Sequence, residues 1–496
     1  MSAQLTSTPD LAVGARSFVA RGVAGHVIDG VTVESRLGGT LDVVDPSTGL
    51  VVMQSAKATQ DDVDAAVAAA RRAFDDGRWS GMPPLARERV LRRFADLIEE
   101  RGADLADLDS LDAGVLSKWC SYIVSFTVEA LQYNAGWPSK LEGSIPPVGP
   151  DFTVLQQKAP LGVVAAIMPW NGPTAVWAGV SAALAAGCTV ILKPAEQTPL
   201  TATYIGELAQ QAGFPAGVVN VLQGDGSAGA ALVSHPGVDA VSFTGSAETG
   251  RRIAAAAAPT LKHVSLELGG KSPFIVFDDA DIANASVGAM ASVWGNSGQV
   301  CTAGTRTLVQ RGIYDDFVAS LVRDSESLTV GSAFDASSDL GPLITREQLS
   351  KVQTYIEVGQ QEGADLRLGG VTAGSGGFLQ APTIFAGVRN DMRIAQEEIF
   401  GPVMSVIPFD TEDEAYRIAN DTQYGLAAGV WTNDLSRAHR ASNALRAGTV
   451  WINTYQATNP AVSYGGWKQS GYGRNLGGAT VESFTHLKSM WMAVGK

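Results

Sequence analysis

The sequence predicts an α/β protein in which helices cover both faces of parallel sheets. From Gly162 to about Glu267, strand-like apolar runs alternate with helical stretches, and a second alternating set follows Gly270. Such alternation is typical of doubly wound sheets with right-handed crossovers. The length of 496 residues is too great for one hydrophobic core. We therefore expect two α/β units with a ligand-binding cleft between them.

The first helices carry clear boundary signals. Thr59 and Asp62 form a capping pattern, and apolar residues recur at helical spacing until Gly77. Leu91 and Phe94 belong to a second amphipathic helix. We interpret these residues as packing positions and assign no function to them.

The segment between Lys158 and Lys193 contains no charged residue and is long enough for a transmembrane helix. Proline and glycine divide it at PWNGP (169–173) and at Gly187. We therefore predict a buried strand over 162–168, a helix over 174–186 and a second strand over 189–192. Further strands are expected at GVVNVLQG, AVSFTG, HVSLEL, PFIVF, RTLVQ, VMSVIPF, AAGVWT and TVWIN.

Charge and cysteine content limit the function classes. Lys and Arg number 36 and Asp and Glu 50, giving a formal net charge of −14. This sign argues against nucleic-acid and anionic-membrane partners. Cys120, Cys188 and Cys301 have no metal-ligand spacing, so we expect neither a disulfide framework nor a metal site. The N-terminal segment has no basic stretch before an apolar core, so we expect a cytoplasmic protein.

The stretch GNSGQVCTAGTR (295–306) places Cys301 among small and polar neighbours instead of an apolar run. A structural cysteine usually packs like a small hydrophobe. Gly298 and Gly304 would allow the backbone to approach a ligand. The stretch alone leaves a reactive thiol and a structural thiol open.

Two stretches compete as a dinucleotide phosphate site. GDGSAG (224–229) matches G-x-G-x-x-G after a strand, although Gly and Asp are also ordinary turn residues. FTGSAETG (243–250) opens directly into a helix, where Gly245 permits close approach and the Ser246 hydroxyl could bind phosphate. Upstream, Lys193 and Glu196 follow a strand and suit the ribose hydroxyls of an adenosine, or form a solvated surface pair.

The longer motifs resemble the NAD(P)-dependent aldehyde dehydrogenase superfamily. PWNGP, LKPAEQTPLTA, FTGS, LELGGKSP, GQVCTAGTR, EEIFGPV and YGGWKQSGYGR occur in the order and at the separations of that family, from about residue 20 to the C-terminus. The resemblance implies a Rossmann-like cofactor domain, a second α/β catalytic domain and a small β oligomerisation arm. The implied ranges are 1–137 with 160–266, 267–465, and 138–159 with 478–496.

The resemblance also implies residue roles. Cys301 matches the nucleophile, Glu267 the general base, and Asn171 the side-chain donor of the oxyanion hole. The expected NAD contacts, with NADP as a second option, are Lys193, Glu196, Gly245, Ser246, Glu398, Phe400 and Trp170. In this family GDGSAG is not the phosphate clamp. The Glu196 carboxylate would accept from a 2′-hydroxyl and repel a 2′-phosphate, which favours NAD.

The implied reaction converts an aldehyde to its carboxylic acid through a thiohemiacetal and a thioester on Cys301. A thiolate suits these steps because it is strongly nucleophilic and leaves readily afterwards. Preplaced donors would stabilise the oxyanion, and Glu267 would activate the hydrolytic water. Cys120 and Cys188 are interpreted as packing residues.

Two departures from the family pattern bear on specificity. Gly172 replaces the Phe of PWNFP, so we expect a wider tunnel and tolerance of bulky or aromatic aldehydes. Trp177 and Tyr455 are the favoured tunnel residues, with Trp294, Tyr464 and Trp467 as further candidates. GRNLGG puts Asn475 and Gly478 where many relatives have Glu, which leaves Glu267 without a second acid/base.

Three other functions stay open. A coenzyme A-acylating semialdehyde dehydrogenase generally lacks the base of LELGG, which Glu267 supplies here. A cysteine hydrolase would need a histidine partner, and a non-catalytic family member would not need Cys301, Glu267 and Asn171. The resemblance further implies a homodimer or homotetramer, because an apolar edge strand at the C-terminus otherwise invites aggregation.

Overall fold

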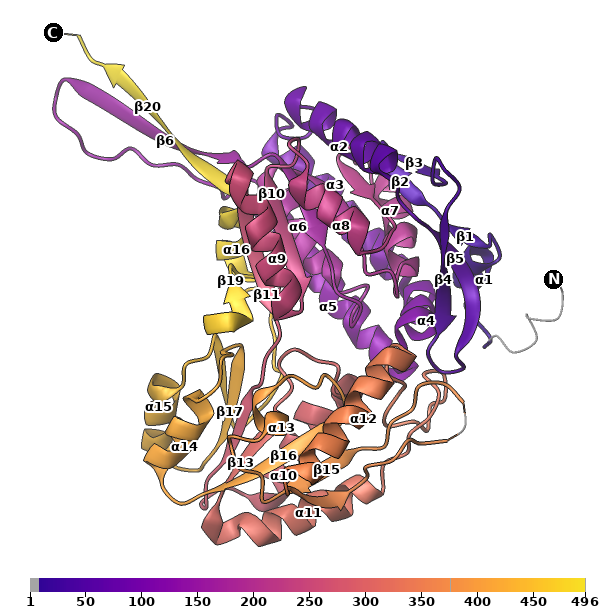
Figure 1. The fold of residues 1–496 in the computed structure, drawn as a ribbon. Helices are drawn as coiled ribbons and strands as arrows, with labels where there is room; N and C mark the ends of the chain where they lie inside the picture. The colour runs from indigo at the N-terminus through magenta and orange to yellow at the C-terminus, as the bar shows by residue number, and fades with distance from the viewer. Residues whose placement is uncertain (1–8, 375, 496) are drawn as a thin grey trace.

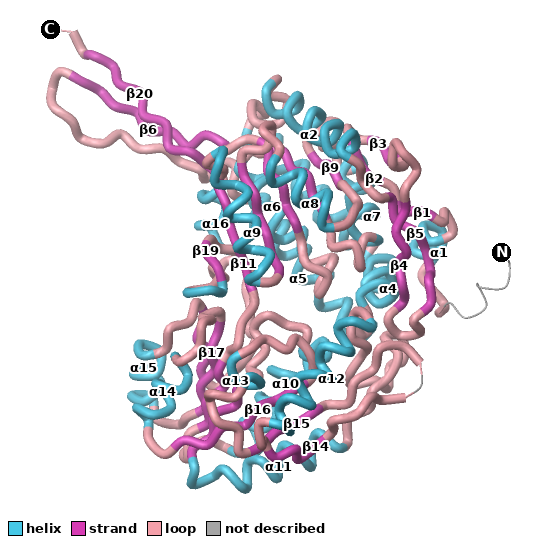
Figure 2. Tube along the Cα trace, in the orientation of Figure 1, coloured by secondary structure: helices cyan, strands magenta, loops and turns pink. Residues whose placement is uncertain are grey.

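The structure, a computed structural model, describes residues 9–374 and 376–495. Two α/β lobes lie one above the other, and a two-stranded ribbon projects from the upper one (Figure 1). Figure 2 shows that strands form the middle of each lobe and helices its outside. The layered α/β architecture predicted from the sequence is confirmed.

An eight-stranded sheet forms the centre of the upper lobe, in the order β19-β11-β10-β7-β8-β9-β2-β3. Its five central strands are parallel, whereas β19, β2 and β3 are antiparallel to their neighbours. The parallel strands are β11 (His263–Leu268), β10 (Ala240–Gly245), β7 (Val163–Ile167), β8 (Thr189–Lys193) and β9 (Val219–Val221). The other three are β19 (Gly471–Tyr472), β2 (His26–Ile28) and β3 (Val31–Val33).

Helices pack on both faces of this sheet, which explains why its strands carry apolar residues on both sides. One face holds α2 (Gln60–Asp75), α8 (Gly226–Ser234) and α9 (Ala247–Ala257). The other side contains α3 (Pro84–Glu100), α4 (Gly102–Ala113), α5 (Ser117–Ala135), α6 (Val176–Ala186) and α7 (Leu200–Gln211). Beyond them lie α1 (Val13–Val19) and a small sheet of β1 (Val23–Ala24), β5 (Leu50–Ala56) and β4 (Thr40–Asp45).

The lower lobe contains a seven-stranded sheet in the order β14-β15-β16-β13-β12-β17-β18. The strands are β14 (Asp365–Leu368), β15 (Thr383–Ala386), β16 (Val403–Phe409), β13 (Arg306–Gln310), β12 (Pro273–Val276), β17 (Ala427–Trp431) and β18 (Thr449–Ile452). One face packs against α10 (Ile282–Trp294) and α11 (Tyr314–Glu326). The opposite face packs against α12 (Arg346–Gln361), α13 (Arg393–Gln396), α14 (Glu412–Asn420) and α15 (Leu435–Ala444).

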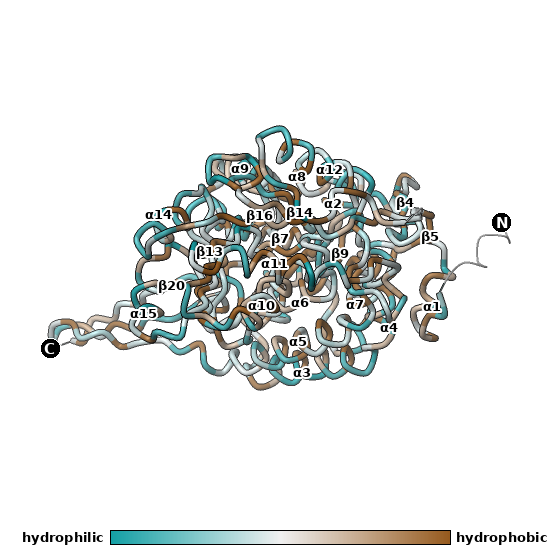
Figure 3. Tube along the Cα trace, turned by 90° about the horizontal axis from the view of Figure 1, so that it is seen from below, coloured by the Kyte–Doolittle hydropathy of each residue, from teal (hydrophilic) through white to brown (hydrophobic). Residues whose placement is uncertain are grey.

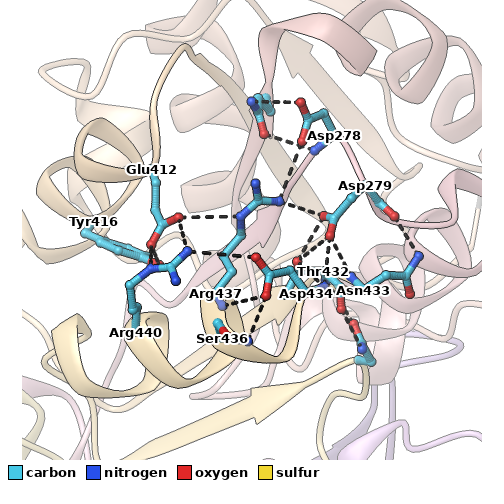
Figure 4. Close-up of polar contacts among 12 residues, drawn as sticks. Asp278, Asp279, Glu412, Tyr416, Thr432, Asn433, Asp434, Ser436, Arg437 and Arg440 are labelled. Atoms are coloured by element: carbon cyan, nitrogen blue, oxygen red, sulfur yellow. Dashed lines mark hydrogen bonds and ion pairs between the residues drawn. The ribbon is translucent and has the colours of Figure 1, made fainter.

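Figure 3 shows hydrophobic residues concentrated in the interior strands and hydrophilic residues along much of the outside. At the edge of the lower lobe, charged pairs join α14 and α15 to the loop after β12 (Figure 4). Arg437 is 2.8 Å from Asp279, and Arg440 is 2.7 Å from Glu412. The Arg437 guanidinium also lies 4.7 Å from the ring centre of Phe277. This network fixes surface helices and lies outside the cleft described below.

The projecting ribbon pairs β6 (Phe152–Pro160) with β20 (Thr485–Ala493) in antiparallel register. Helix α16 (Gly477–Ser483) precedes it and packs against α6. The boundary expected at residue 478 therefore falls inside α16, and the paired strand begins at Thr485.

Several sequence predictions are confirmed. Thr59 and Asp62 form the capping box of α2, and the segment between Lys158 and Lys193 folds as β7, α6 and β8. The N-terminal strands and the β14–β15 pair were not predicted. Within the described ranges, no helix is long and apolar enough to cross a membrane.

Candidate active site

A cleft of about 730 Å³ lies where the parallel strands of the upper lobe end. Its lining includes the ends of β7, β8, β10 and β11, the starts of α8 and α9, and part of α12. Ligands of open α/β sheets bind at the carboxyl ends of strands. Cys301 and Glu267 both line this cleft.

Cys301 lies in a tight loop between α10 and β13. Asn296 and Ser297 adopt left-handed backbone angles, with φ of 46° and 54°, which is unusual outside glycine. Gly298 is also left-handed, and a Cβ there would overlap the backbone of Gly401. The expectation that Gly298 lets a ligand approach the backbone is therefore wrong. The space beside Gly298 is occupied by the loop that contains Gly401.

The structure also contradicts the expectation that Gly304 lets a ligand approach the backbone. A Cβ on Gly304 would lie 2.8 Å from the Ser292 hydroxyl and 3.2 Å from the Phe274 Cβ. Gly304 thus allows the cysteine loop to pack closely against α10 and β12, and the space beside it is not left for a substrate.

Gln299 anchors the cysteine loop to the segment of the same chain that contains Pro342 and Ile344. Its buried side chain donates to the carbonyl of Pro342 at 3.3 Å and accepts from the amide of Ile344 at 2.9 Å. Its carbonyl accepts a hydrogen bond from the Asn171 side chain at 2.9 Å. The amide nitrogen of Asn171 carries a second hydrogen, which leaves one donor for a ligand in the cleft.

Glu267 ends its strand inside the protein, with 4% of its surface exposed. Neither carboxylate oxygen has a hydrogen-bond partner among the described residues. Burial raises the pKa of Glu267 to about 8, although the positive charge of Arg474 opposes that rise. A carboxylate with such a pKa can act as a general base near neutral pH.

The thiol of Cys301 has one close polar neighbour. Its Sγ lies 3.0 Å from the hydroxyl of Tyr464. Burial raises the pKa of the thiol to about 11, and the Tyr464 hydrogen bond opposes this rise. None of the five histidines lines the cleft, so the histidine partner of a cysteine hydrolase is not found there.

Lys193 and Glu196 meet at the end of β8. The ammonium and carboxylate groups are 3.6 Å apart, and both residues line the cleft. Burial lowers the pKa of Lys193, and Glu196 partly offsets this effect. The pair can donate to one ribose hydroxyl and accept from another.

Two helix N-termini face the same cleft. Ser246 caps α9 by accepting from the Thr249 amide, and Gly245 sits directly before it. A Cβ on Gly245 would lie 2.5 Å from the Phe243 ring, which explains the glycine. Gly226 and Gly229 of GDGSAG also line the cleft, so this stretch is a neighbour of the site.

The far end of the cleft holds Glu398 and Phe400. Glu398 accepts from the Gly270 amide at 3.1 Å. Trp170 contacts Phe400 edge-on, with ring centres 5.2 Å apart. All three line the cleft with Gln348 and Lys351 of α12, which sequence reasoning missed because no motif marks them.

The chemistry of this lining fits a dinucleotide. It provides a Lys–Glu pair, a capped helix N-terminus for pyrophosphate and a second carboxylate beside an aromatic ring. Its volume lies within the range of about 300–1,000 Å³ typical of ligand sites.

The residues expected to line a substrate tunnel do not lie together in the structure. Trp177 is fully buried and packs edge-on against Phe94 in the core. Tyr455 donates to the carbonyl of Thr302 at 2.7 Å and packs beside Trp451. Gly172 follows Asn171, and a Cβ there would approach only Ala175, at 3.6 Å.

A second cavity of about 270 Å³ reaches Tyr464. Trp451 and Tyr464 supply its aromatic walls, and no acidic or basic residue lines it. The Tyr464 hydroxyl contacts Cys301, so one wall residue of this cavity touches the thiol that lines the larger cleft. The remaining lining residues are Thr449, Ala457, Thr458, Asn459, Val462, Ser463 and Leu476.

Of the two C-terminal departures, Gly478 has a structural explanation and the side chain of Asn475 has none. A Cβ on Gly478 would overlap the Trp137 ring, so no side chain fits there. Asn475 exchanges two backbone hydrogen bonds with Tyr464, each of 2.7 Å.

Cys120 and Cys188 are fully buried, and burial raises their pKa values to about 12 and about 11.

A cleft whose lining fits a dinucleotide and also contains a thiol, an unpaired carboxylate and an amide donor is typical of an oxidoreductase. The model of the aldehyde dehydrogenase family matches residues 32–490. The chain belongs to this family.

Relatives and solved structures extend the match over nearly the whole chain. Aldehyde dehydrogenase 1 of Tanacetum cinerariifolium is 46% identical over 467 residues, covering 93% of this chain and 94% of that protein. A betaine aldehyde dehydrogenase of Agrobacterium fabrum is 45% identical over 481 residues, covering 95% and 97%. The NAD+ complex of an aldehyde dehydrogenase from Bacillus cereus superimposes with a TM-score of 0.97 at 42% identity, covering 99% and 100%.

Proposed function

We propose that this enzyme oxidises an aldehyde to its carboxylic acid with NAD, using Cys301 as nucleophile and Glu267 as general base. One observation carries the proposal. The thiol and the unpaired carboxylate line the same cleft as the dinucleotide-binding groups. Reduction of NAD requires the aldehyde carbon to become a hydride donor, which a thiolate adduct provides.

In the first step the Cys301 thiolate attacks the carbonyl carbon. A carbon–sulfur bond forms and the carbonyl electron pair moves to oxygen. The free N–H of the Asn171 side chain and the backbone N–H of Cys301 would stabilise this oxyanion. Asn171 is preorganised for the role because its other N–H is held by Gln299.

Bound NAD would supply the hydride acceptor at this step, and loss of hydride from the Cys301 adduct would leave an acyl thioester on the sulfur. Glu267 then removes a proton from water as the water attacks the acyl carbon. Collapse of that intermediate breaks the carbon–sulfur bond, and the electron pair returns to sulfur. The products are the carboxylic acid and the thiolate.

NAD is the cofactor. Lys193 and Glu196 would hold the adenosine ribose, Gly245 and Ser246 the pyrophosphate, and Glu398, Phe400 and Trp170 the nicotinamide end. The Glu196 carboxylate would repel a 2′-phosphate, so NADP would bind more weakly.

The second cavity supports an aldehyde with a bulky or aromatic substituent. Its lining offers aromatic walls and no acidic or basic side chain, so stacking and cation–π contacts would be its main interactions. Gly172, the neighbour of Asn171 in the chain, would add room beside that cleft residue because it has no side chain. Betaine aldehyde, the substrate named for several relatives, carries a fixed positive charge and is the comparison substrate.

The ribbon supports a homodimer or homotetramer. It projects from the body, and several of its apolar side chains are exposed, including Trp491 at 62%. A two-stranded ribbon is marginally stable alone, so pairing with a second subunit would stabilise it. The three free cysteines support a cytoplasmic location.

The test is near-ultraviolet detection of reduced nicotinamide with NAD or NADP and a panel of aliphatic, terpenoid, aromatic and betaine aldehydes. We expect turnover without coenzyme A, a preference for NAD and highest efficiency on bulky or aromatic aldehydes. Activity only after coenzyme A is added would favour the acylating alternative and overturn the role of Glu267. Silence with and without coenzyme A would favour a non-catalytic member.

A further inference from the structure

We propose that Tyr464 is a catalytic residue whose phenolic O–H donates a hydrogen bond to the Cys301 sulfur and stabilises its thiolate. This inference rests on the proposed function, because it requires Cys301 to be the nucleophile. The two side chains are separated by 163 positions in sequence, yet their polar atoms lie 3.0 Å apart.

Tyr464 must be the donor once Cys301 has ionised, since a thiolate has no proton to give. Burial raises the pKa of Tyr464 well above its usual value, and the nearby Cys301 raises it further. The phenol therefore keeps its proton at neutral pH. The Tyr464 hydroxyl has no other hydrogen-bond partner within the described ranges.

The backbone holds Tyr464 in place. Its N–H donates to the Asn475 carbonyl and its carbonyl accepts from the Asn475 N–H. The next residue, Gly465, lies against Glu267: a Cβ there would be 2.7 Å from a carboxylate oxygen. The hydroxyl is thus fixed on the sulfur by the same segment that touches the general base.

The hydrogen bond would act twice in the reaction. Before attack, it favours the thiolate over the thiol, in an environment where burial opposes ionisation. During hydrolysis, the carbon–sulfur bond breaks and its electron pair moves to sulfur, where the same O–H is already placed. No proton leaves Tyr464 in either step.

The experiment compares wild type with Tyr464→Phe, which keeps the ring and removes the hydroxyl. The rate of iodoacetamide alkylation at Cys301 is followed by peptide mass spectrometry between pH 7 and 9, without aldehyde. We expect a roughly tenfold slower reaction, because loss of a hydrogen bond to a charged group reduces the thiolate more than added basicity raises its nucleophilicity. The efficiency kcat/KM should fall by a similar factor.

Tyr455→Phe is the matched control. It removes another phenol that bonds to Thr302, beside Cys301, without touching the sulfur. We expect its alkylation rate to stay within about twofold of wild type. Thermal melting of both variants reports whether they remain folded.

Two negative results would have different meanings. If wild type turns over aldehyde and Tyr464→Phe is alkylated as fast as wild type, the role of Tyr464 is overturned and the proposed function stands. If Cys301 of wild type resists alkylation and no aldehyde is oxidised, the proposed function itself fails. An equal loss of alkylation rate in Tyr455→Phe and Tyr464→Phe would show that the effect comes from altered packing and not from the hydrogen bond to the Cys301 sulfur.

Discussion

Gly298 packs so closely against Gly401 that any side chain on Gly298 would overlap the Gly401 carbonyl oxygen. This contact joins the cysteine loop to the loop that carries Glu398 and Phe400, so it helps to fix Cys301 relative to that part of the cleft. The left-handed φ of 75° at Gly298 adds a second requirement for glycine.

Gly298→Ala should therefore destabilise the protein by about 2–4 kcal/mol, from backbone strain and overpacking together. Chemical unfolding measures this loss, and activity should fall with it. Gly312→Ala is the control, because a Cβ at Gly312 meets no atom within 4 Å. Equal stability of the two variants would contradict the packing argument.

Much of the site could be predicted from the sequence because its parts are local. Glu267 and Lys193 lie at the carboxyl ends of strands and Ser246 directly follows one, and parallel strands end at one edge of the sheet. The contact of Tyr464 with Cys301 joins segments that no periodicity relates. Its only sequence signal was an aromatic residue near GGWKQSG, which also suits a tunnel wall.

Other features depended on tertiary packing. Trp177 was one of the aromatic residues expected in the tunnel, but it is fully buried and packs against Phe94 in the core. Gly298 and Gly304 were interpreted as ligand-approach positions, whereas neighbouring backbone and side chains fill their space. The sequence shows which residues are glycine, but only the structure shows which atoms lie against them.

Glu267→Gln should stop thioester hydrolysis while leaving the first hydride transfer possible. No other carboxylate can replace Glu267 at the C-terminal motif, since Asn475 and Gly478 stand at those positions. We expect one equivalent of reduced nicotinamide per active site, followed by a steady rate lower by about 10²–10⁴. Stopped-flow absorbance and intact mass of the acyl-enzyme test this, and full steady turnover would refute it.

The pH dependence of kcat should follow Glu267 where hydrolysis limits turnover. Burial raises the pKa of this carboxyl to about 8, so below that pH it is mostly protonated and cannot accept a proton from water. The rate should thus rise about tenfold per unit towards pH 8 and level off above it. Steady-state assays in buffers of constant ionic strength measure the profile, and a flat line from pH 6 to 9 would exclude the assignment.

Gly172→Phe should narrow the space beside the carbonyl. A Cβ at this position would contact only Ala175, at 3.6 Å, so the substitution introduces no clash at the Cβ. We expect kcat/KM to fall at least tenfold for an aromatic aldehyde and to change little for acetaldehyde, a difference of about 1.4 kcal/mol between their transition states. An unchanged ratio of the two efficiencies would show that Gly172 does not shape the substrate site.

The ribbon should be the contact between subunits. Leu487 and Trp491 lie an even number of residues apart on β20, so they share one face, and both are exposed in the single chain. Replacing both by Glu would place charges where apolar side chains meet a second copy, and should dissociate the oligomer into folded monomers. Light scattering after size exclusion measures the mass, with Val371→Glu, an exposed apolar residue far from β20 in sequence, as the control. An unchanged mass for the double variant would place the contact elsewhere.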